Sequence, residues 1–137
     1  MSNKMEILTV KAIPQSIEIV TAFADRIMTE HECSGIIKAK ISIVIDEIVS
    51  NISSYAYPDG GGELEFSIGV SEGSVIMTFT DMGQPFDPLK NPDPDVSIPT
   101  SKKQVGGLGI FMTKKMMDSV AYRYDDGKNI LTITKKL

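Results

Sequence analysis

The sequence predicts an α+β fold, a two-layer sandwich in which helices cover one face of a mixed, mostly antiparallel sheet. Three patterns support this prediction: apolar residues at helical spacing in the first half, strict two-residue alternation in the middle, and a Pro-rich segment without periodicity before the last helix. The expected order is strand, helix, helix, strand, strand, long loop, helix, strand, strand. The 137 residues fit a single domain, residues 1–137.

The first half is expected to hold one strand and two helices. A proline opens the first helix at a position that helices tolerate, and isoleucines at helical spacing form a stripe about 80° wide on the second. Pro58 and the turn Asp59–Gly62 end the second helix. The expected bounds are Met5–Ile13 for the strand, Pro14–Glu30 for the first helix, His31–Gly35 for a linker and Ile36–Tyr57 for the second helix.

The second half is expected to hold four strands and a third helix. Leu64–Val70 and Val75–Phe79 alternate apolar and polar residues, and should pair as a hairpin through Ser71–Gly73. The segment Gln84–Gln104 holds five of the seven prolines, and loops of this length in a compact domain are usually functional, often as lids. The remaining expected bounds are Gly107–Met117 for the third helix and Val120–Tyr124 and Asn129–Thr134 for the last strands, joined by Asp125–Lys128.

Composition argues against several classes of function. The net charge of −4 disfavours a dedicated nucleic-acid binder, because neutralising phosphates requires clustered Lys and Arg. Apolar runs stay well short of the ~20 residues of a membrane span and no signal peptide is recognised, so we expect no membrane contact. The single cysteine, Cys33, fits a reducing compartment, and we expect a cytoplasmic protein.

The second predicted helix carries a carboxylate and an amide on one face. Glu47 and Asn51 are four residues apart and share the flank of the isoleucine stripe, whereas Asp46 points away. A carboxylate and an amide that border the core stripe would lie at the edge of a cleft. Helical geometry alone leaves the simpler alternative open, in which both are surface residues without a task.

Asp81 continues the odd-numbered, core-facing series of its strand, so its carboxylate should leave the sheet at the strand end on the core side. Such a carboxylate needs hydrogen-bond donors, because its desolvation is otherwise uncompensated. The donor is either a protein group, with Asp81 capping the next loop, or a ligand amine such as that of adenine. Gly83 suits both, since it allows a tight turn or the close approach of a planar ring.

Three glycines surround the expected start of the third helix: Gly106, Gly107 and Gly109. The free N–H groups and the positive dipole end of a helix start suit phosphate, although close packing of a helix on a sheet gives the same glycine pattern. No Walker G-K-[ST] sequence occurs, and the glycines do not follow a strand of a βαβ unit. Neither His31 nor Cys33 has the neighbours that a metal site or a nucleophile would need.

Three segments in this order resemble the GHKL superfamily of Bergerat-fold ATP-binding proteins, which includes histidine-kinase catalytic domains, Hsp90, gyrase B and MutL. They are IDEIVSN (Ile45–Asn51), TDMGQPFDP (Thr80–Pro88) and VGGLGIF (Val105–Phe111). Within the superfamily, DMGQPFDP and GGLGIFMTKKMMD look most like the anti-sigma-factor serine/threonine kinases. The resemblance covers about Met5 to Lys136 and implies the Bergerat fold with a long ATP lid.

The resemblance implies a role for individual residues. Glu47 matches the helix glutamate that acts as general base, and Asn51 matches the asparagine that ligates Mg²⁺. Asp81 matches the aspartate that accepts from the adenine amino group, and Gly83 the glycine beside the base. The second glycine box, whose amides approach the phosphates, is matched by Gly106, Gly107 and Gly109.

Other positions are open or depart from the superfamily pattern. The lid corresponds to Pro88–Gln104, where Ser101, Lys102 and Lys103 either meet phosphates or are simply solvated. Pro85 stands where the first glycine box usually has a second glycine, a change common in the subfamily that this chain resembles. The superfamily often places a threonine of a late strand near adenine. Thr132 and Thr134 are the two candidates, and strand parity does not decide between them.

The resemblance implies a stand-alone Mg-ATP-dependent serine/threonine kinase that phosphorylates a small antagonist (anti-anti-sigma-like) protein and binds a sigma factor or similar regulator; a homodimer is possible. One alternative is a non-catalytic module that uses ATP to shape a partner surface, which the presence of both Glu47 and Asn51 disfavours. Another is an ATP-binding domain that acts with a histidine-phosphorelay partner in trans. The lone His31 in a linker disfavours the second alternative.

Overall fold

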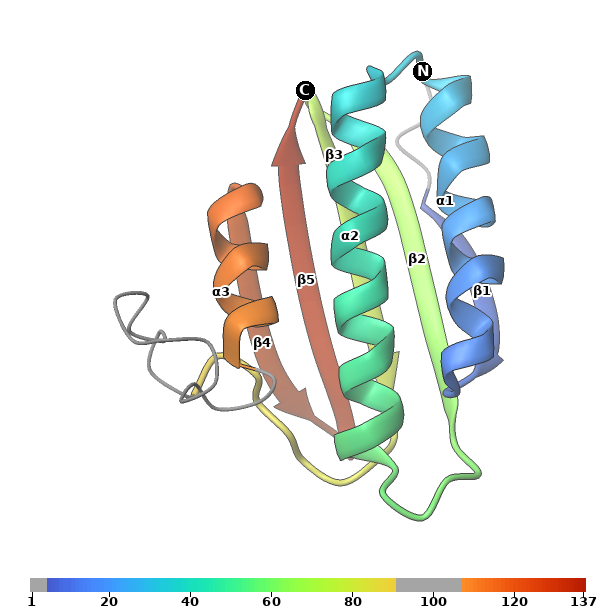
Figure 1. Cartoon of the computed structure of the whole chain (residues 1–137), viewed down its shortest axis with the longest axis vertical. Coiled ribbons are helices and arrows are strands. Elements are labelled where there is room, and N and C mark those ends of the chain that lie inside the picture. Colours follow the sequence, from blue (N-terminus) through green and yellow to red (C-terminus); the bar gives the residue numbers. More distant parts are fainter. Residues whose placement is uncertain (1–4, 91–106) are drawn as a thin grey trace.

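The fold is a two-layer α+β sandwich in which three α-helices cover one face of a five-stranded sheet (Figure 1). It is seen in a computed structural model that describes residues 5–90 and 107–137. The strands lie in the order β1-β2-β3-β5-β4, and each neighbouring pair is antiparallel. The predicted class and layers are confirmed, and the described strands pair antiparallel throughout rather than in a mixed sheet.

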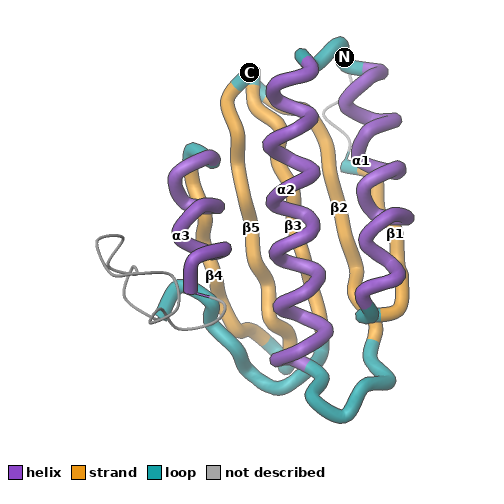
Figure 2. Tube along the Cα trace, viewed as in Figure 1, coloured by secondary structure: helices purple, strands orange, loops and turns teal. Residues whose placement is uncertain are grey.

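The elements follow the predicted order, and most of their bounds lie within a few residues of those expected (Figure 2). The helices are α1 (Ile17–Glu30), which follows the short 3₁₀ turn Pro14–Ser16, α2 (Gly35–Asn51) and α3 (Gly107–Met116). The strands are β1 (Glu6–Lys11), β2 (Glu63–Ser71), β3 (Ser74–Asp81), β4 (Ser119–Asp125) and β5 (Lys128–Lys136). Within the described residues, no helix is both long and apolar enough to span a bilayer.

The second helix departs most from the prediction, which carried it to Tyr57. Regular α2 ends at Asn51, and the chain continues as a π-helical turn, η2 (Ile52–Ala56). Such turns are rare and occur often at functional sites. The carbonyl oxygen of Ala56 accepts a hydrogen bond of 2.9 Å from the backbone N–H of Gln84. The π-helical turn therefore ties the end of the helix to the loop that follows β3.

Two-residue turns close both hairpins, β2–β3 and β4–β5. The φ angles are 52° and 77° at Glu72–Gly73, and 51° and 76° at Asp126–Gly127. Positive φ at both central residues matches the type I′ turn, whose twist suits antiparallel strands. The turns fall within the expected segments, and they fix the register of β2 against β3 and of β4 against β5. In the separate pairing of β3 with β5, Asp81 lies opposite Asn129.

The core lies between the helices and the facing side of the sheet. Phe66 of β2 and Phe79 of β3 are fully buried with ring centroids 5.1 Å apart. Against them packs the isoleucine stripe of α2, whose buried members are Ile41, Ile45 and Ile48. Because this stripe faces the sheet, the residues on its flank lie at the edge of the core.

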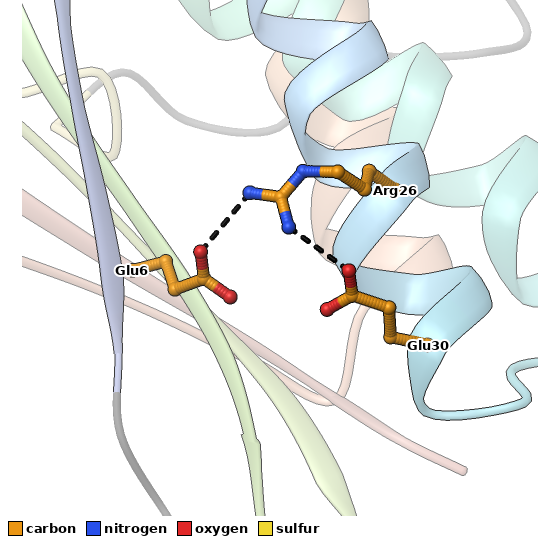
Figure 3. Close-up of polar contacts among 3 residues, drawn as sticks. All are labelled: Glu6, Arg26 and Glu30. Atoms are coloured by element: carbon orange, nitrogen blue, oxygen red, sulfur yellow. Dashed lines mark hydrogen bonds and ion pairs between the residues drawn. The ribbon is translucent and has the colours of Figure 1, made fainter.

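An exposed ion-pair cluster joins α1 to the edge strand β1. Arg26 donates one hydrogen bond to Glu6 and one to Glu30, each at 3.0 Å (Figure 3). The side chain of Arg26 is 49% exposed, so water screens both pairs and they contribute little to stability.

Candidate functional site

The predicted site residues come from separate elements that meet at one end of the sheet (Figure 1). Glu47 and Asn51 lie near the end of α2, Asp81 is the last residue of β3, and Gly109 lies in the first turn of α3. Gly83 lies two residues beyond the end of β3. Glu47 and Asn51 of α2 thus reach the same region of the fold as Asp81, although they lie 30 residues or more from it in the sequence.

Asp81 is buried, with 4% of its surface exposed, on the helix-facing side of the sheet as parity predicted. Its Oδ1 accepts two hydrogen bonds of 2.9 Å, from the backbone N–H of Gly83 and from Nδ2 of Asn129. The described residues provide no donor to its Oδ2. Burial raises the pKa of Asp81 above its ordinary value, and the two hydrogen bonds oppose this rise. Protein donors therefore satisfy one carboxylate oxygen and leave the other for a further donor.

Asn129 is a site residue that sequence reasoning missed. Its Nδ2 donates to Asp81 and, at 3.0 Å, to the carbonyl oxygen of Gln84. Its Oδ1 accepts from the backbone N–H of Phe86 at 3.0 Å and from the hydroxyl of Tyr122. One side chain of β5 thus holds the end of β3 and the loop that leaves it.

Strand parity carried the signal for Asn129. It shares the helix-facing side of β5 with the buried Leu131 and Ile133. The same alternation places Thr132 and Thr134 on the opposite face of the sheet. Neither of the two threonines therefore faces Asp81. The residue of β5 that lies opposite Asp81 is Asn129.

Glu47 is half-buried between α2 and α3. Its Oε2 accepts a hydrogen bond of 2.9 Å from Nδ2 of Asn51, which is only 8% exposed. A Cβ on Gly109 would overlap the carboxyl group of Glu47, so the glycine allows the first turn of α3 to approach that carboxylate. Burial raises the pKa of Glu47, the bond from Asn51 opposes this, and the exposed Asp46 adds to the rise. The pair therefore lies at the core edge rather than in open solvent.

Gly83 packs against the protein backbone. A Cβ there would overlap the carbonyl group of Ala56 at the end of η2. Its N–H is the local donor to Asp81, and the N–H of Gln84 binds the same Ala56 carbonyl. The structure thus shows the tight-turn interpretation of Gly83, with a close approach that requires glycine.

A narrow cavity of about 20 Å³ lies between α2 and the sheet, with Asn51 and Asp81 both in its wall. This is room for about one water molecule. Apolar side chains make up most of the remaining wall, including Phe86, whose ring stacks on Tyr55 with centroids 4.9 Å apart and planes at 20°. A planar base would therefore enter only after Phe86 or its neighbours move.

Part of the predicted site lies outside the described residues. This holds for Gly106 and for the lid residues Ser101, Lys102 and Lys103. Gly107 is the first residue of α3, as expected. Within residues 5–90 and 107–137, no three His, Cys, Asp or Glu side chains come together as a metal site.

Comparison with known proteins gives matches along most of the chain. Residues 10–135 match the family described as histidine kinase-like ATPase domain. The serine-protein kinase RsbW of Halalkalibacterium halodurans is 35% identical over 106 residues, covering 71% of this chain and 61% of RsbW. The serine/threonine-protein kinase BtrW of Bordetella bronchiseptica is 23% identical over 135 residues, covering 98% of this chain and 95% of BtrW. The matched part thus spans about three fifths of the RsbW relative and nearly all of BtrW.

Two solved structures share the fold. The RsbU and RsbW domains of a Mycobacterium tuberculosis protein match with a TM-score of 0.67 and 18% identity, covering 98% of this chain and 32% of that one. The Acinetobacter baumannii histidine kinase AdeS matches with a TM-score of 0.51 and 17% identity, covering 99% of this chain and 68% of that one. At these identities the likeness concerns the fold alone.

Proposed function

Since this chain belongs to the family of histidine kinase-like ATPase domains, we propose that it binds Mg-ATP and transfers the γ-phosphoryl group to a serine or threonine of a small antagonist protein. A sigma factor or similar regulator would be its second partner, as the sequence resemblance implies. The kinase names of RsbW and BtrW support the reaction class. The observation that carries the proposal is the convergence of Glu47, Asn51 and Asp81 at one end of the sheet.

Asp81 suits the amino group of adenine. Its Oδ2 lacks a donor among the described residues, while Oδ1 is already satisfied by Gly83 and Asn129. The apolar wall of the cavity suits the faces of a purine ring, once the cavity widens around Phe86. A carboxylate oxygen beside apolar groups gains most from a donor that the ligand supplies.

Asn51 suits Mg²⁺. Its Nδ2 is used by Glu47, which leaves its Oδ1, the oxygen type that this hard cation prefers, without a donor among the described groups. Mg²⁺ typically binds through one or two protein oxygens together with phosphate oxygens, which fits a site without a carboxylate cluster. When bound, it would neutralise charge on the phosphates during transfer.

Glu47 suits the role of general base. Its raised pKa brings proton acceptance closer to neutral pH, where a base acts most efficiently. The hydrogen bond from Asn51 holds the carboxylate in place beside the first turn of α3. Glu47 would orient the attacking hydroxyl and accept its proton, while phosphoryl transfer itself depends on positioning and charge neutralisation.

Gly109→Ala is expected to slow phosphoryl transfer at least about tenfold without lowering the melting temperature. Alanine favours the helix by up to about 1 kcal/mol, whereas its Cβ takes the place of the Glu47 carboxyl group, which can swing away on its flexible side chain. Circular dichroism melts and a transfer assay measure the two effects. Gly35→Ala at the start of α2 is the matched control, because its Cβ would contact nothing, and transfer should stay unchanged. A native transfer rate in Gly109→Ala would contradict the role of this close approach.

Incubation with γ-labelled ATP, Mg²⁺ and a candidate antagonist protein tests the proposed function. We expect Mg-ATP to raise the melting temperature and the label to appear on the antagonist in an acid-stable form, as phosphoserine or phosphothreonine. Binding without label transfer would favour the non-catalytic module, and acid-labile label on a histidine would favour the phosphorelay alternative. No stabilisation by Mg-ATP would overturn the nucleotide site itself.

A further inference from the structure

The side-chain amide of Asn129 makes its full set of hydrogen bonds, and their partners lie around the proposed nucleobase site. Its Nδ2 donates to Asp81 and Gln84, and its Oδ1 accepts from Phe86 and Tyr122. A side-chain amide offers two N–H donors and one oxygen with two lone pairs, so these contacts use its whole capacity. This network also defines which atom of the amide is nitrogen.

We propose that Asn129 is the positioning residue for nucleobase recognition: it fixes the rotation of the Asp81 carboxylate, so that the oxygen without a protein donor stays directed toward the amino group of the ligand. This inference rests on the proposed nucleotide function. It assigns Asn129 an action through Asp81, with no contact of its own to the base.

The geometry explains why Gly83 alone is insufficient. Its N–H comes from two residues beyond Asp81 and holds the carboxylate only from its own loop. Asn129 approaches from the neighbouring strand as the register partner of Asp81, is 5% exposed, and binds the same Oδ1. Together the two donors reach one oxygen from two segments and fix the rotation of the carboxylate. Without Asn129, the single hydrogen bond from Gly83 would leave the carboxylate freer to rotate about its Cβ–Cγ bond, and the second oxygen would lose its fixed direction.

The charge of Asp81 depends on the same contact. Burial raises its pKa, and the bond from Asn129 is the larger of the two hydrogen-bond effects that oppose the rise. The titratable groups that face Asp81 are the phenols of Tyr57 and Tyr122, whose own pKa values are raised by burial, so both are neutral near neutral pH. Loss of Asn129 would therefore raise the pKa of Asp81 further. As the pH falls, the variant would lose the carboxylate form, and the ligand binding that needs it, at a higher pH than the wild type.

The decisive measurement compares ATP with purine riboside 5′-triphosphate, which lacks only the amino group. The wild type should prefer ATP by about tenfold or more, and Asn129→Ala should reduce this preference to about twofold. General damage to the fold would lower the affinities for both triphosphates equally and leave the preference for ATP intact. Thr132→Ala is the matched control on the same strand, because its side chain is on the other face, and should keep the wild-type preference. A wild-type preference in Asn129→Ala would overturn the inference.

A second measurement needs no nucleotide. Carbon-detected NMR titration of the Asp81 carboxyl group should give a higher pKa in Asn129→Ala than in the wild type, and an unchanged pKa would overturn the positioning role. Tyr122→Phe, which removes only one donor to Oδ1 of Asn129, offers a milder variant with an intermediate preference for ATP. If the wild type bound neither triphosphate, the proposed function would fail, while the titration would still decide whether Asn129 holds Asp81.

Discussion

Glu47→Gln is expected to lower phosphoryl transfer by roughly a hundredfold to ten-thousandfold, the range typical of a lost general base, while Mg-ATP affinity stays nearly unchanged. Glutamine has the shape of glutamate, so it still fits beside Gly109, and its amide oxygen can still accept the bond from Asn51. What it loses is the capacity to take a proton. Single-turnover label transfer and a nucleotide-binding titration measure the two quantities separately.

Asp46→Asn provides the matched control for Glu47→Gln. It makes the same change of charge on the adjacent residue of α2, whose side chain is exposed and points away from the site. Transfer by Asp46→Asn should therefore stay close to that of the wild type. A native rate in Glu47→Gln would refute the assignment of the base, and a joint loss of ATP binding would indicate a binding role instead.

The pH profile of transfer gives an independent check on Glu47. Because burial raises the pKa of its carboxyl group, protonation should begin at a higher pH than for an ordinary glutamate. The rate of the wild type should fall as the pH drops through that raised pKa. Glu47→Gln should lack this acid limb, since its amide does not titrate in this range.

The fold was predictable because most of its signals are local. Helical spacing located the isoleucine stripe of α2, and two-residue alternation placed Asp81 on the buried side of β3. The resemblance of three segments to the GHKL superfamily is confirmed by the family match over residues 10–135. The roles of individual residues stay predictions that the proposed variants test.

The parts that the sequence did not reveal depend on contacts between distant segments. The bond between Asp81 and Asn129 joins residues 48 positions apart and requires the order in which β5 lies beside β3. The π-helical turn Ile52–Ala56 reads as ordinary helix in sequence, because apolar spacing does not distinguish it from a last α-helical turn. The sequence resemblance implies a phosphate-binding role for Gly109, whereas in the structure its lack of a side chain also makes room for the carboxyl group of Glu47.

Asp81→Asn is expected to weaken ATP binding by about ten- to a hundredfold and to shift the preference toward inosine triphosphate. Both protein donors meet Oδ1, from Gly83 and Asn129, so the amide oxygen of the variant should take that position. Its NH₂ group then occupies the position of Oδ2, where it faces the amino group of adenine donor to donor. The 6-oxo group of hypoxanthine offers an acceptor there instead. Competition binding of ATP and inosine triphosphate measures the shift.

The same substitution should leave stability unchanged or raise it, which separates it from general damage. The folded-state pKa of Asp81 is raised by burial, so ionisation of this carboxyl group opposes folding as the pH rises through that pKa, and a neutral amide removes the cost. Asp87→Asn is the matched control: its Oδ1 accepts from the backbone N–H of Leu89 at 2.8 Å, and it lies outside the cavity wall. It should keep the wild-type ratio of the two affinities. An unchanged ratio in Asp81→Asn would mean that the nucleobase binds elsewhere. A stable variant with a reversed preference would identify Asp81 as the group that recognises the nucleobase.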